Sequence, residues 1–356
     1  MEDKYRITGL MSGSSMDGTD LACCDLTWNG LRWDYRILEA ETIPYGSAMK
    51  SKLEVACHWM RNEIDELDRE LGAYYADLLK DFHLRHKLVP DYIASHGHTI
   101  LHDPQRGLTY QAGNGSIMAE RTGMVVVNDF RSEDVAQGGQ GAPLVPLGDS
   151  LLFSRYEGCL NLGGFSNISF DNREGQRMAY DLSPANMALN HVAGLKGLEF
   201  DRDGELARQG SLHTDLFERM NQLDYYQQSA PKSLGREWFI GTLLPLMNQS
   251  ALSPKNLMAT VLEHIAFQVA RGINDAGLRS VLITGGGALN QSLIKRIGHY
   301  TTASLEIPGE QLIHYKEALV FALLGVLRIR GEINCLSSVT GGKADLSAGT
   351  IHNIKI

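Results

Sequence analysis

Three short turns rich in glycine and small polar residues constrain the fold of this chain most strongly. They are MSGSSMDGTD at residues 11–20, LGGFSN at residues 162–167 and TGGGALN at residues 284–290. An apolar segment of strand length precedes each turn, and another follows the first two. Turns of this kind present backbone N–H groups to phosphate oxygens. Together they indicate nucleotide binding, although each alone is equally compatible with an ordinary hairpin turn or loop.

The segments between the turns alternate between strand-like and helix-like patterns. This alternation predicts an α/β architecture with mixed sheets. Strands are expected at residues 5–10, 19–26, 91–95, 123–128, 159–162, 165–170, 178–181 and 280–284, and helices at 65–86, 255–276, 290–298 and 315–330.

Length and charge narrow the class of protein. A chain of 356 residues exceeds what one hydrophobic core usually serves, so we expect two domains. The boundaries predicted are 1–155 and 156–356, with the C-terminal segment free to pack back on the first domain. The net charge of −9 argues against nucleic acid or an anionic membrane as the main partner. The five cysteines lack Cys-x-x-Cys spacing, and no apolar run is long enough to span a bilayer, which indicates a cytoplasmic protein.

One acidic residue stands at a position typical of a ligand site. Asp181 ends the strand expected at residues 178–181, with Ser183 expected as the N-cap of the next helix and Pro184 at its first position. In α/β folds, ligands bind at the carboxyl ends of strands. The alternative is a carboxylate that only caps the helix start.

Nine motifs make the chain resemble the anhydro-N-acetylmuramic acid kinases, a family of the actin, sugar-kinase and heat-shock-ATPase superfamily. The resemblance spans nearly the whole chain and implies two actin-like, ribonuclease H-like domains with a central nucleotide cleft. The motifs, in order, are GLMSGSSMDGTD, SHGHT, NDFRSEDVAQGGQGAPLVP, LNLGGFSNIS, YDLSPANM, DRDGELARQG, PKSLGREWF, ITGGGALN and EALVFA.

The resemblance also implies a reaction. Members open 1,6-anhydro-N-acetylmuramic acid with water and transfer a phosphoryl group from ATP to the freed 6-oxygen. Asp181 would be the general base, and Asp17 would hold Mg²⁺ or its waters. A small anhydrosugar would be the partner, and the chain is expected to form a homodimer. The residues implied to bind ATP are Ser12, Gly13, Ser14, Ser15, Asp17, Gly18, Gly163, Gly164, Asn167, Gly285, Gly286 and Gly287; those implied to bind the sugar are His98, Asp129, Arg131, Asn186 and Glu317. For Arg131 and Glu317, a structural salt bridge or a helix-start role is the open alternative.

The chain departs from the family pattern near two of these residues. His98 replaces the usual glutamine, Leu182 and Ser183 replace the usual Thr-Gly after the aspartate, and Asn190 replaces an acidic residue. His96, His98 and His102 are interpreted as site or core histidines, because no carboxylate or cysteine stands at ligand spacing beside them.

Other functions stay open at this point. One is a kinase for a different anhydrosugar such as levoglucosan, and another is a non-catalytic nucleotide-binding protein of the same superfamily. A dehydrogenase is the weakest alternative, because the chain lacks a complete Gly-x-Gly-x-x-Gly.

The first turn yields a direct test. Asp17→Asn should lower magnesium-dependent turnover far more than it lowers the melting temperature, because a surface turn tolerates the isosteric amide. Turnover titrated against Mg²⁺ and a thermal melt measure the two effects. Normal turnover with an unchanged magnesium dependence would make Asp17 an ordinary turn residue.

Overall fold

The computed structural model describes residues 3–13, 16 and 18–353, and the chain divides into two compact units. Unit 1 comprises Met1–Leu152 and Tyr315–Ile356, and unit 2 comprises Phe153–His314. The C-terminal 42 residues, which the sequence boundaries assigned to the second domain, are thus grouped with the first unit.

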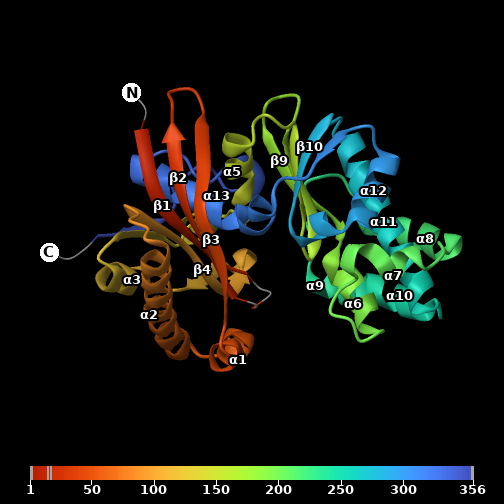
Figure 1. The fold of residues 1–356 in the computed structure, drawn as a ribbon, viewed down its shortest axis with the longest axis horizontal. Coiled ribbons are helices and arrows are strands. Elements are labelled where there is room, and N and C mark those ends of the chain that lie inside the picture. The colour runs from red at the N-terminus through yellow and green to blue at the C-terminus, as the bar shows by residue number, and fades with distance from the viewer. Residues whose placement is uncertain (1–2, 14–15, 17, 354–356) are drawn as a thin grey trace. The chain divides into compact units, whose positions relative to one another are not determined.

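The sheet of unit 1 combines an antiparallel meander with parallel strands (Figure 1). Its order is β12-β6-β4-β1-β2-β3, with β5 paired to β4. β1, β2 and β3 are antiparallel, whereas β4 and β6 run parallel to β1. The strands are β1 (Asp3–Ser12), β2 (Gly18–Trp28), β3 (Trp33–Pro44), β4 (Tyr92–Asp103), β5 (Leu108–Ala112), β6 (Val125–Asn128) and β12 (Thr350–His352).

The sheet of unit 2 repeats this topology with five strands in the order β11-β10-β7-β8-β9. β7, β8 and β9 form the antiparallel meander, and β10 and β11 continue the sheet parallel to β7. This repetition confirms the predicted two-domain, actin-like α/β class with mixed sheets. The strands are β7 (Gly158–Leu162), β8 (Phe165–Asp171), β9 (Arg177–Pro184), β10 (Ser280–Thr284) and β11 (Ser304–Glu306).

The helices follow the predicted pattern, with several ends shifted. The predicted helix 65–86 begins four residues earlier, at Arg61, and the predicted helix 315–330 begins at Glu310. The helices are α1 (Ser47–Val55), α2 (Arg61–His86), α3 (Gly115–Thr122), α4 (Ser132–Ala136), α5 (Val145–Leu152), α6 (Asn186–Gly194), α7 (Glu205–Arg208), α8 (Thr214–Asn221), α9 (Arg236–Trp238), α10 (Leu244–Gln249), α11 (Pro254–Asp275), α12 (Gln291–Tyr300), α13 (Glu310–Arg330) and α14 (Ser337–Thr340).

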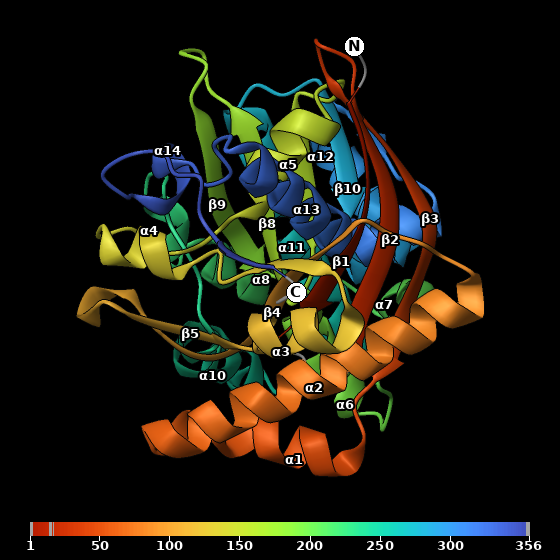
Figure 2. The same ribbon diagram turned by 90° about the vertical axis from the view of Figure 1, so that its left-hand side faces the viewer.

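The middle of β1, residues 7–10, is buried on both faces, because α2 and α13 pack against opposite sides of it (Figure 2). Side chains alternate along a strand, so Thr8 faces α2, where its hydroxyl lies 2.8 Å from His83 Nε2. Gly9 faces α13 instead. A Cβ built on Gly9 would lie only 1.9 Å from the carbonyl oxygen of Ala318. The absence of a side chain at residue 9 therefore lets α13 pack directly on the strand.

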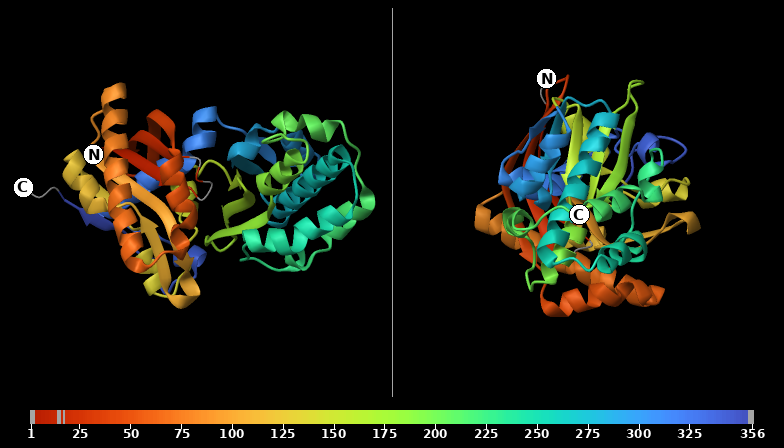
Figure 3. Two further views of the ribbon diagram at one scale, coloured as in Figure 1. Left: turned by 90° about the horizontal axis from the view of Figure 1, so that it is seen from below. Right: turned by 90° about the vertical axis from the view of Figure 1, so that its right-hand side faces the viewer.

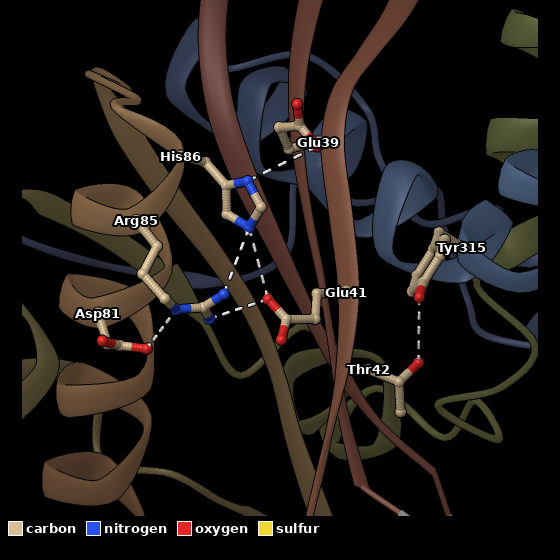
Figure 4. Close-up of polar contacts among 7 residues, drawn as sticks. All are labelled: Glu39, Glu41, Thr42, Asp81, Arg85, His86 and Tyr315. Carbon is tan, nitrogen blue, oxygen red and sulfur yellow. Dashed lines mark hydrogen bonds and ion pairs between the residues drawn. The ribbon is translucent and has the colours of Figure 1, made fainter.

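Polar contacts tie β3 to the elements beside it on the surface of unit 1 (Figure 4). Arg85 lies between Asp81 and Glu41, at 2.7 and 2.8 Å from their carboxylates. On the other side of β3, the hydroxyls of Thr42 and Tyr315 are 3.4 Å apart. Exposed pairs of this kind contribute only about 0–1 kcal/mol each. Burial therefore dominates the stability of unit 1.

In unit 2 the large core lies on one face of the sheet, where the helices gather (Figure 3). Leu160 and Leu162 on β7 and Ile168 on β8 are fully buried against α6, α11 and α12. α11 is the main support of this core, because fourteen of its residues are buried. The residues between these apolar positions point to the opposite face.

The start of α6 differs from the prediction. β9 continues to Pro184, and the N-cap residue of α6 is Ala185 rather than Ser183. Ser183 is instead fully buried, with its hydroxyl 3.1 Å from that of Ser166. Because the strand does not end at residue 181, Asp181 lies inside β9 and does not cap the helix.

Within the described part of the chain, no helix is both long and apolar enough to cross a membrane.

The contact at Gly9 predicts a large effect from a single methyl group. Gly9→Ala should lower the free energy of unfolding by about 1–3 kcal/mol or more, because the strand and α13 would have to separate. Gly46→Ala is the matched control in the same unit, since a Cβ at Gly46 meets no atom within 4 Å. We expect this control, which lies at the start of α1, to lower the free energy of unfolding by less than about 1 kcal/mol. Urea unfolding compares them, and equal losses would contradict close packing at Gly9.

Candidate active site

Asp181 is held by three hydrogen bonds from one segment of unit 2. Its backbone N–H donates to the Lys232 carbonyl at 3.1 Å, and its carbonyl accepts from the Tyr225 hydroxyl at 2.7 Å. The Leu234 N–H donates to carboxylate oxygen Oδ2 at 2.8 Å. Oδ1 has no hydrogen-bond partner among the residues described. One oxygen of a fixed carboxylate is therefore left to act on a ligand.

The surroundings also change the acidity of this carboxylate. Burial raises the pKa of Asp181 from 3.8 to about 6, and the hydrogen bond from Leu234 opposes part of that rise. At neutral pH the group is mostly ionised, yet it holds a proton more readily than an exposed aspartate does. These are properties of a general base.

Asp181 belongs to a row of polar residues that crosses the sheet of unit 2. Thr284 on β10 pairs with Asn161 on β7, Asn161 with Asn167 on β8, and Asn167 with Asp181 on β9. Residues directly opposite each other share a face, so this row lies on the face away from the core. A β-bulge follows Asp181 and leaves Leu182 without a partner on β8. Bulges of this kind commonly redirect side chains near active sites.

The second and third glycine turns come together beside this row. Gly285 has a φ of +80°, and a Cβ on it would lie 2.4 Å from Asn161 Oδ1. The Asn186 side chain donates to the Leu162 carbonyl at 3.1 Å and lies against Gly287. The structure thus places Gly163, Gly164, Asn167, Asp181, Asn186 and Gly285–Gly287 in one region of unit 2.

The carbonyls of the second turn are bonded to the start of α6. The Gly163 carbonyl accepts from Asn186 N at 3.0 Å, and the Gly164 carbonyl accepts from Ala185 N at 2.8 Å. In a trans peptide the N–H points opposite to the C=O, so the N–H groups of Gly164 and Phe165 point away from α6. The turn therefore directs N–H groups outward, as an anion site requires.

In unit 1 the first turn begins above a buried polar network. Ser12 ends β1, and its hydroxyl lies 2.6 Å from the Tyr45 hydroxyl and 2.8 Å from His98 Nδ1. Tyr45 continues to Tyr75 at 2.9 Å. Burial lowers the pKa of His98 to about 4, so this imidazole is neutral at physiological pH. Ser12 and His98, predicted to bind ATP and sugar respectively, contact each other.

Arg131 is held by an imidazole and a carbonyl, and none of the described carboxylates is hydrogen-bonded to it. Its Nε and Nη2 lie 2.9 and 2.8 Å from His96 Nε2, and Nη1 donates to the Gly141 carbonyl. An arginine only donates, so His96 Nε2 must accept and its Nδ1–H donates to the Gly97 carbonyl. Burial lowers the pKa of Arg131 to about 10, still well above neutrality. The guanidinium thus keeps its positive charge.

Glu317 on α13 interacts electrostatically with Arg131. Burial raises the pKa of Glu317, while the charges of Lys316 and Arg131 oppose that rise. Asp129 precedes Arg131 by two residues and has a φ of +56°, a strained conformation for a residue with a side chain. Its Oδ1 accepts from Ser132 N at 3.3 Å.

The remaining predicted residues lie in or beside the first turn. Gly13 follows β1, and Gly18 begins β2 opposite Pro44. Ser14, Ser15 and Asp17 lie outside the described residues, so the predicted magnesium ligand is among those not described. Elsewhere in the described chain, no three histidine, cysteine, aspartate or glutamate side chains are grouped to hold a metal ion.

Comparison with known proteins identifies the family. The family model for anhydro-N-acetylmuramic acid kinase matches residues 5–354. The chain belongs to the anhydro-N-acetylmuramic acid kinase family. A relative with that name from Pasteurella multocida is 33% identical over 97% of this chain and 96% of its own length. Another from Gloeobacter violaceus is 34% identical over 98% and 99%. A solved ROK-family glucokinase from Streptomyces griseus, in complex with glucose and AMPPNP, is 11% identical, with a TM-score of 0.38 over 90% of this chain and 99% of its own.

Membership of this kinase family makes the chain a phosphotransferase that uses ATP.

Sequence reasoning missed the residues that hold Asp181, which are Tyr225, Lys232 and Leu234. It interpreted His96 as a site or core histidine but did not predict that His96 binds Arg131. The motif PKSLGREWF, at residues 231–239, was the one signal for Lys232 and Leu234, because it was specific to the family but had no assigned role. No motif covered Tyr225. No spacing rule connects residues 181 and 234.

The raised pKa of Asp181 predicts an unusual pH dependence of stability. Because the folded state binds this proton more tightly than the unfolded state, the Asp181 contribution to stability falls as pH rises from about 4 through 6. Asp181→Asn retains an acceptor for Leu234 N–H but cannot ionise. The variant should therefore be more stable than the parent at pH 8, by about 1–3 kcal/mol, with the difference shrinking toward pH 4.

Urea unfolding at pH 4, 6 and 8 measures this difference. Asp171→Asn is the control, because that carboxylate is 54% exposed and pairs with Arg177 at 3.2 Å. We expect no gain in stability from the control at pH 8. A parent that is as stable as Asp181→Asn at pH 8 would show that ionised Asp181 carries no folding cost.

Proposed function

We propose that this chain opens 1,6-anhydro-N-acetylmuramic acid with water and phosphorylates the 6-oxygen with ATP, giving N-acetylmuramic acid 6-phosphate and ADP. The observation that carries the proposal is the fixation of Asp181, with one carboxylate oxygen unbonded and a pKa near neutrality. Membership of the kinase family supplies the reaction class.

In the first part of the reaction, Asp181 acts on water. Oδ1 accepts a proton from a water molecule as that water attacks the anomeric carbon of the sugar. The bond between the anomeric carbon and the bridging 6-oxygen breaks, and its electron pair stays on the oxygen. The other water proton remains on the new anomeric hydroxyl, and Asp181 later releases its proton to solvent.

In the second part, the 6-oxygen attacks the γ-phosphorus of ATP, and ADP leaves. Phosphoryl transfer takes the place of the second carboxylic acid that ordinary glycosidases use to protonate their leaving group. The protein contributes mainly position and charge to such a transfer. We assign phosphate contacts to the N–H groups of the first two turns, and adenosine contacts to the third turn, Gly285–Gly287.

We assign the sugar to Arg131, Glu317 and Asp129. Arg131 supports this role because its charge is held by a neutral imidazole and a carbonyl, so it stays able to attract an anionic group. His98 and Asn186 have hydrogen bonds within their own units. We propose that these two also contact the sugar, from positions beside the first and second turns.

The proposal also includes a magnesium ion, the oligomeric state of the enzyme and its cellular compartment. Asp17 would hold the ion, which would neutralise charge on the ATP phosphates. We further propose that the enzyme is a homodimer of the cytoplasm, where ATP is supplied.

The reaction predicts a specific fate for water oxygen. In ¹⁸O-labelled water, the label should appear on the anomeric oxygen of the product and not in the phosphate, because water attacks carbon and the sugar's own oxygen attacks phosphorus. Mass spectrometry of the product shows this. Asp181→Asn should lower turnover by about 10²- to 10⁴-fold while ATP affinity changes little.

ADP release with and without the anhydrosugar provides the control. Label in the phosphate would indicate plain ATP hydrolysis. ADP release that does not depend on the anhydrosugar would contradict the proposed substrate. Full activity in Asp181→Asn would contradict the proposed role of Asp181 as the base.

A further inference from the structure

The free edge of β9 is covered at Asp181 by residues that follow α8. β9 is the last strand of its sheet, so its outer N–H and C=O groups have no strand partner. The segment 224–234, which we call the edge segment, binds the N–H of Asp181 through the backbone carbonyl of Lys232 and its C=O through the side-chain hydroxyl of Tyr225. The same segment binds carboxylate oxygen Oδ2 through Leu234 N. Backbone and side chain of the base are therefore held by one short piece of chain.

Lys232 closes the edge segment on itself. Its ammonium donates to the carbonyls of Tyr225 at 3.2 Å and Gln228 at 3.1 Å, and lies 4.7 Å from the centre of the Tyr225 ring. The positive charge of Lys232 is thus occupied within the segment. Lys232, whose carbonyl accepts from the Asp181 N–H, is thereby bonded to Tyr225, whose hydroxyl donates to the Asp181 carbonyl.

A second tyrosine anchors the edge segment to the core. The Tyr226 hydroxyl lies 2.9 Å from Nε2 of His264 on α11, and His264 Nδ1 lies 2.7 Å from Asn221 Oδ1. Asn221 Oδ1 also accepts from Gln268, so His264 Nδ1 is the donor and Nε2 accepts from Tyr226. Adjacent tyrosines therefore have different partners: Tyr225 binds the base, and Tyr226 binds the core.

We propose that Tyr225 is a positioning residue for Asp181, which fixes the direction of Oδ1 by bonding the Asp181 carbonyl at the β-bulge. The proposal rests on the proposed function, in which Asp181 is the general base. Without this hydroxyl, the backbone at residue 181 gains freedom at the bulge, and Oδ1 loses its alignment with the attacking water. Misplacement of a catalytic group by about 1 Å can cost on the order of 10²-fold in rate.

The two tyrosines provide a matched pair of variants. Both are buried, at 4% and 3% exposure, and each hydroxyl makes one hydrogen bond to a partner in the same unit. Tyr225→Phe and Tyr226→Phe should each lower the free energy of unfolding by about 1 kcal/mol. Only Tyr225→Phe should lower kcat, by about 10- to 100-fold, with the KM values of ATP and anhydrosugar changing less than about threefold.

A double variant separates positioning from general damage. In the Asp181→Asn background there is no base to position, so adding Tyr225→Phe should change the residual kcat by less than about twofold. A merely structural Tyr225 would lower kcat in both backgrounds. If Tyr225→Phe folds poorly, Lys232→Met tests the same segment, because it removes both bonds to the carbonyls and should also lower kcat without raising either KM.

The outcomes distinguish this proposal from the one on which it rests. Unchanged turnover in Asp181→Asn would overturn the proposed function. Impaired Asp181→Asn with equal kcat values in Tyr225→Phe and Tyr226→Phe would overturn the positioning role alone. A selective loss in Tyr225→Phe that disappears in the Asp181→Asn background would establish it.

Discussion

The hydrogen bonds along the free edge of β9 satisfy a structural need and a chemical one together. An edge strand exposes N–H and C=O groups that must be paired, covered or solvated. Here the edge segment, residues 224–234, pairs those groups at Asp181 and also binds its carboxylate. Asp181, the proposed base, is thus held by a neighbouring segment as well as by its own strand. This suits a reaction in which one carboxylate does the work that two perform in glycosidases.

The repeated sheet topology explains where the other candidate residues lie. In each unit, the first strand of the meander ends in a glycine turn, and parallel strands end beside it. Ser12 and Arg131 follow this rule in unit 1, and Gly163 and Gly285 follow it in unit 2. Loops at the carboxyl ends of parallel strands carry the ligand sites of α/β proteins. The positions of these residues thus follow from the order of the strands, and the motifs determine which side chains stand at those positions.

The sequence was informative where a feature is local and weak where it depends on distant contacts. The strands beside the glycine turns and the long helices were predicted because apolar periodicity records burial directly. The predicted start of α6 was wrong because Ser183 was interpreted as an N-cap, whereas its hydroxyl is bonded to Ser166 inside the sheet. The contact between residues 181 and 234 had no local signal at all. The strand and the helix that support a site can thus be predicted, but not the residues that hold its side chains.

Buried charges in this protein fall into two groups, and the difference separates candidate site residues from supporting ones. Asp134 accepts hydrogen bonds from Gly141 N at 2.7 Å and from the Thr340 hydroxyl at 2.7 Å, and Lys316 pairs with Asp149 at 3.1 Å. These charges are matched within their unit. Asp181 instead has one backbone donor on its carboxylate, and Arg131 is bound by a neutral imidazole and a carbonyl. Leaving such a charge unmatched costs folding free energy, and that cost is recovered only if a ligand supplies the missing partner. This pattern supports the proposal that Asp181 faces a ligand, whereas the charge of Arg131 is offset in part by Glu317.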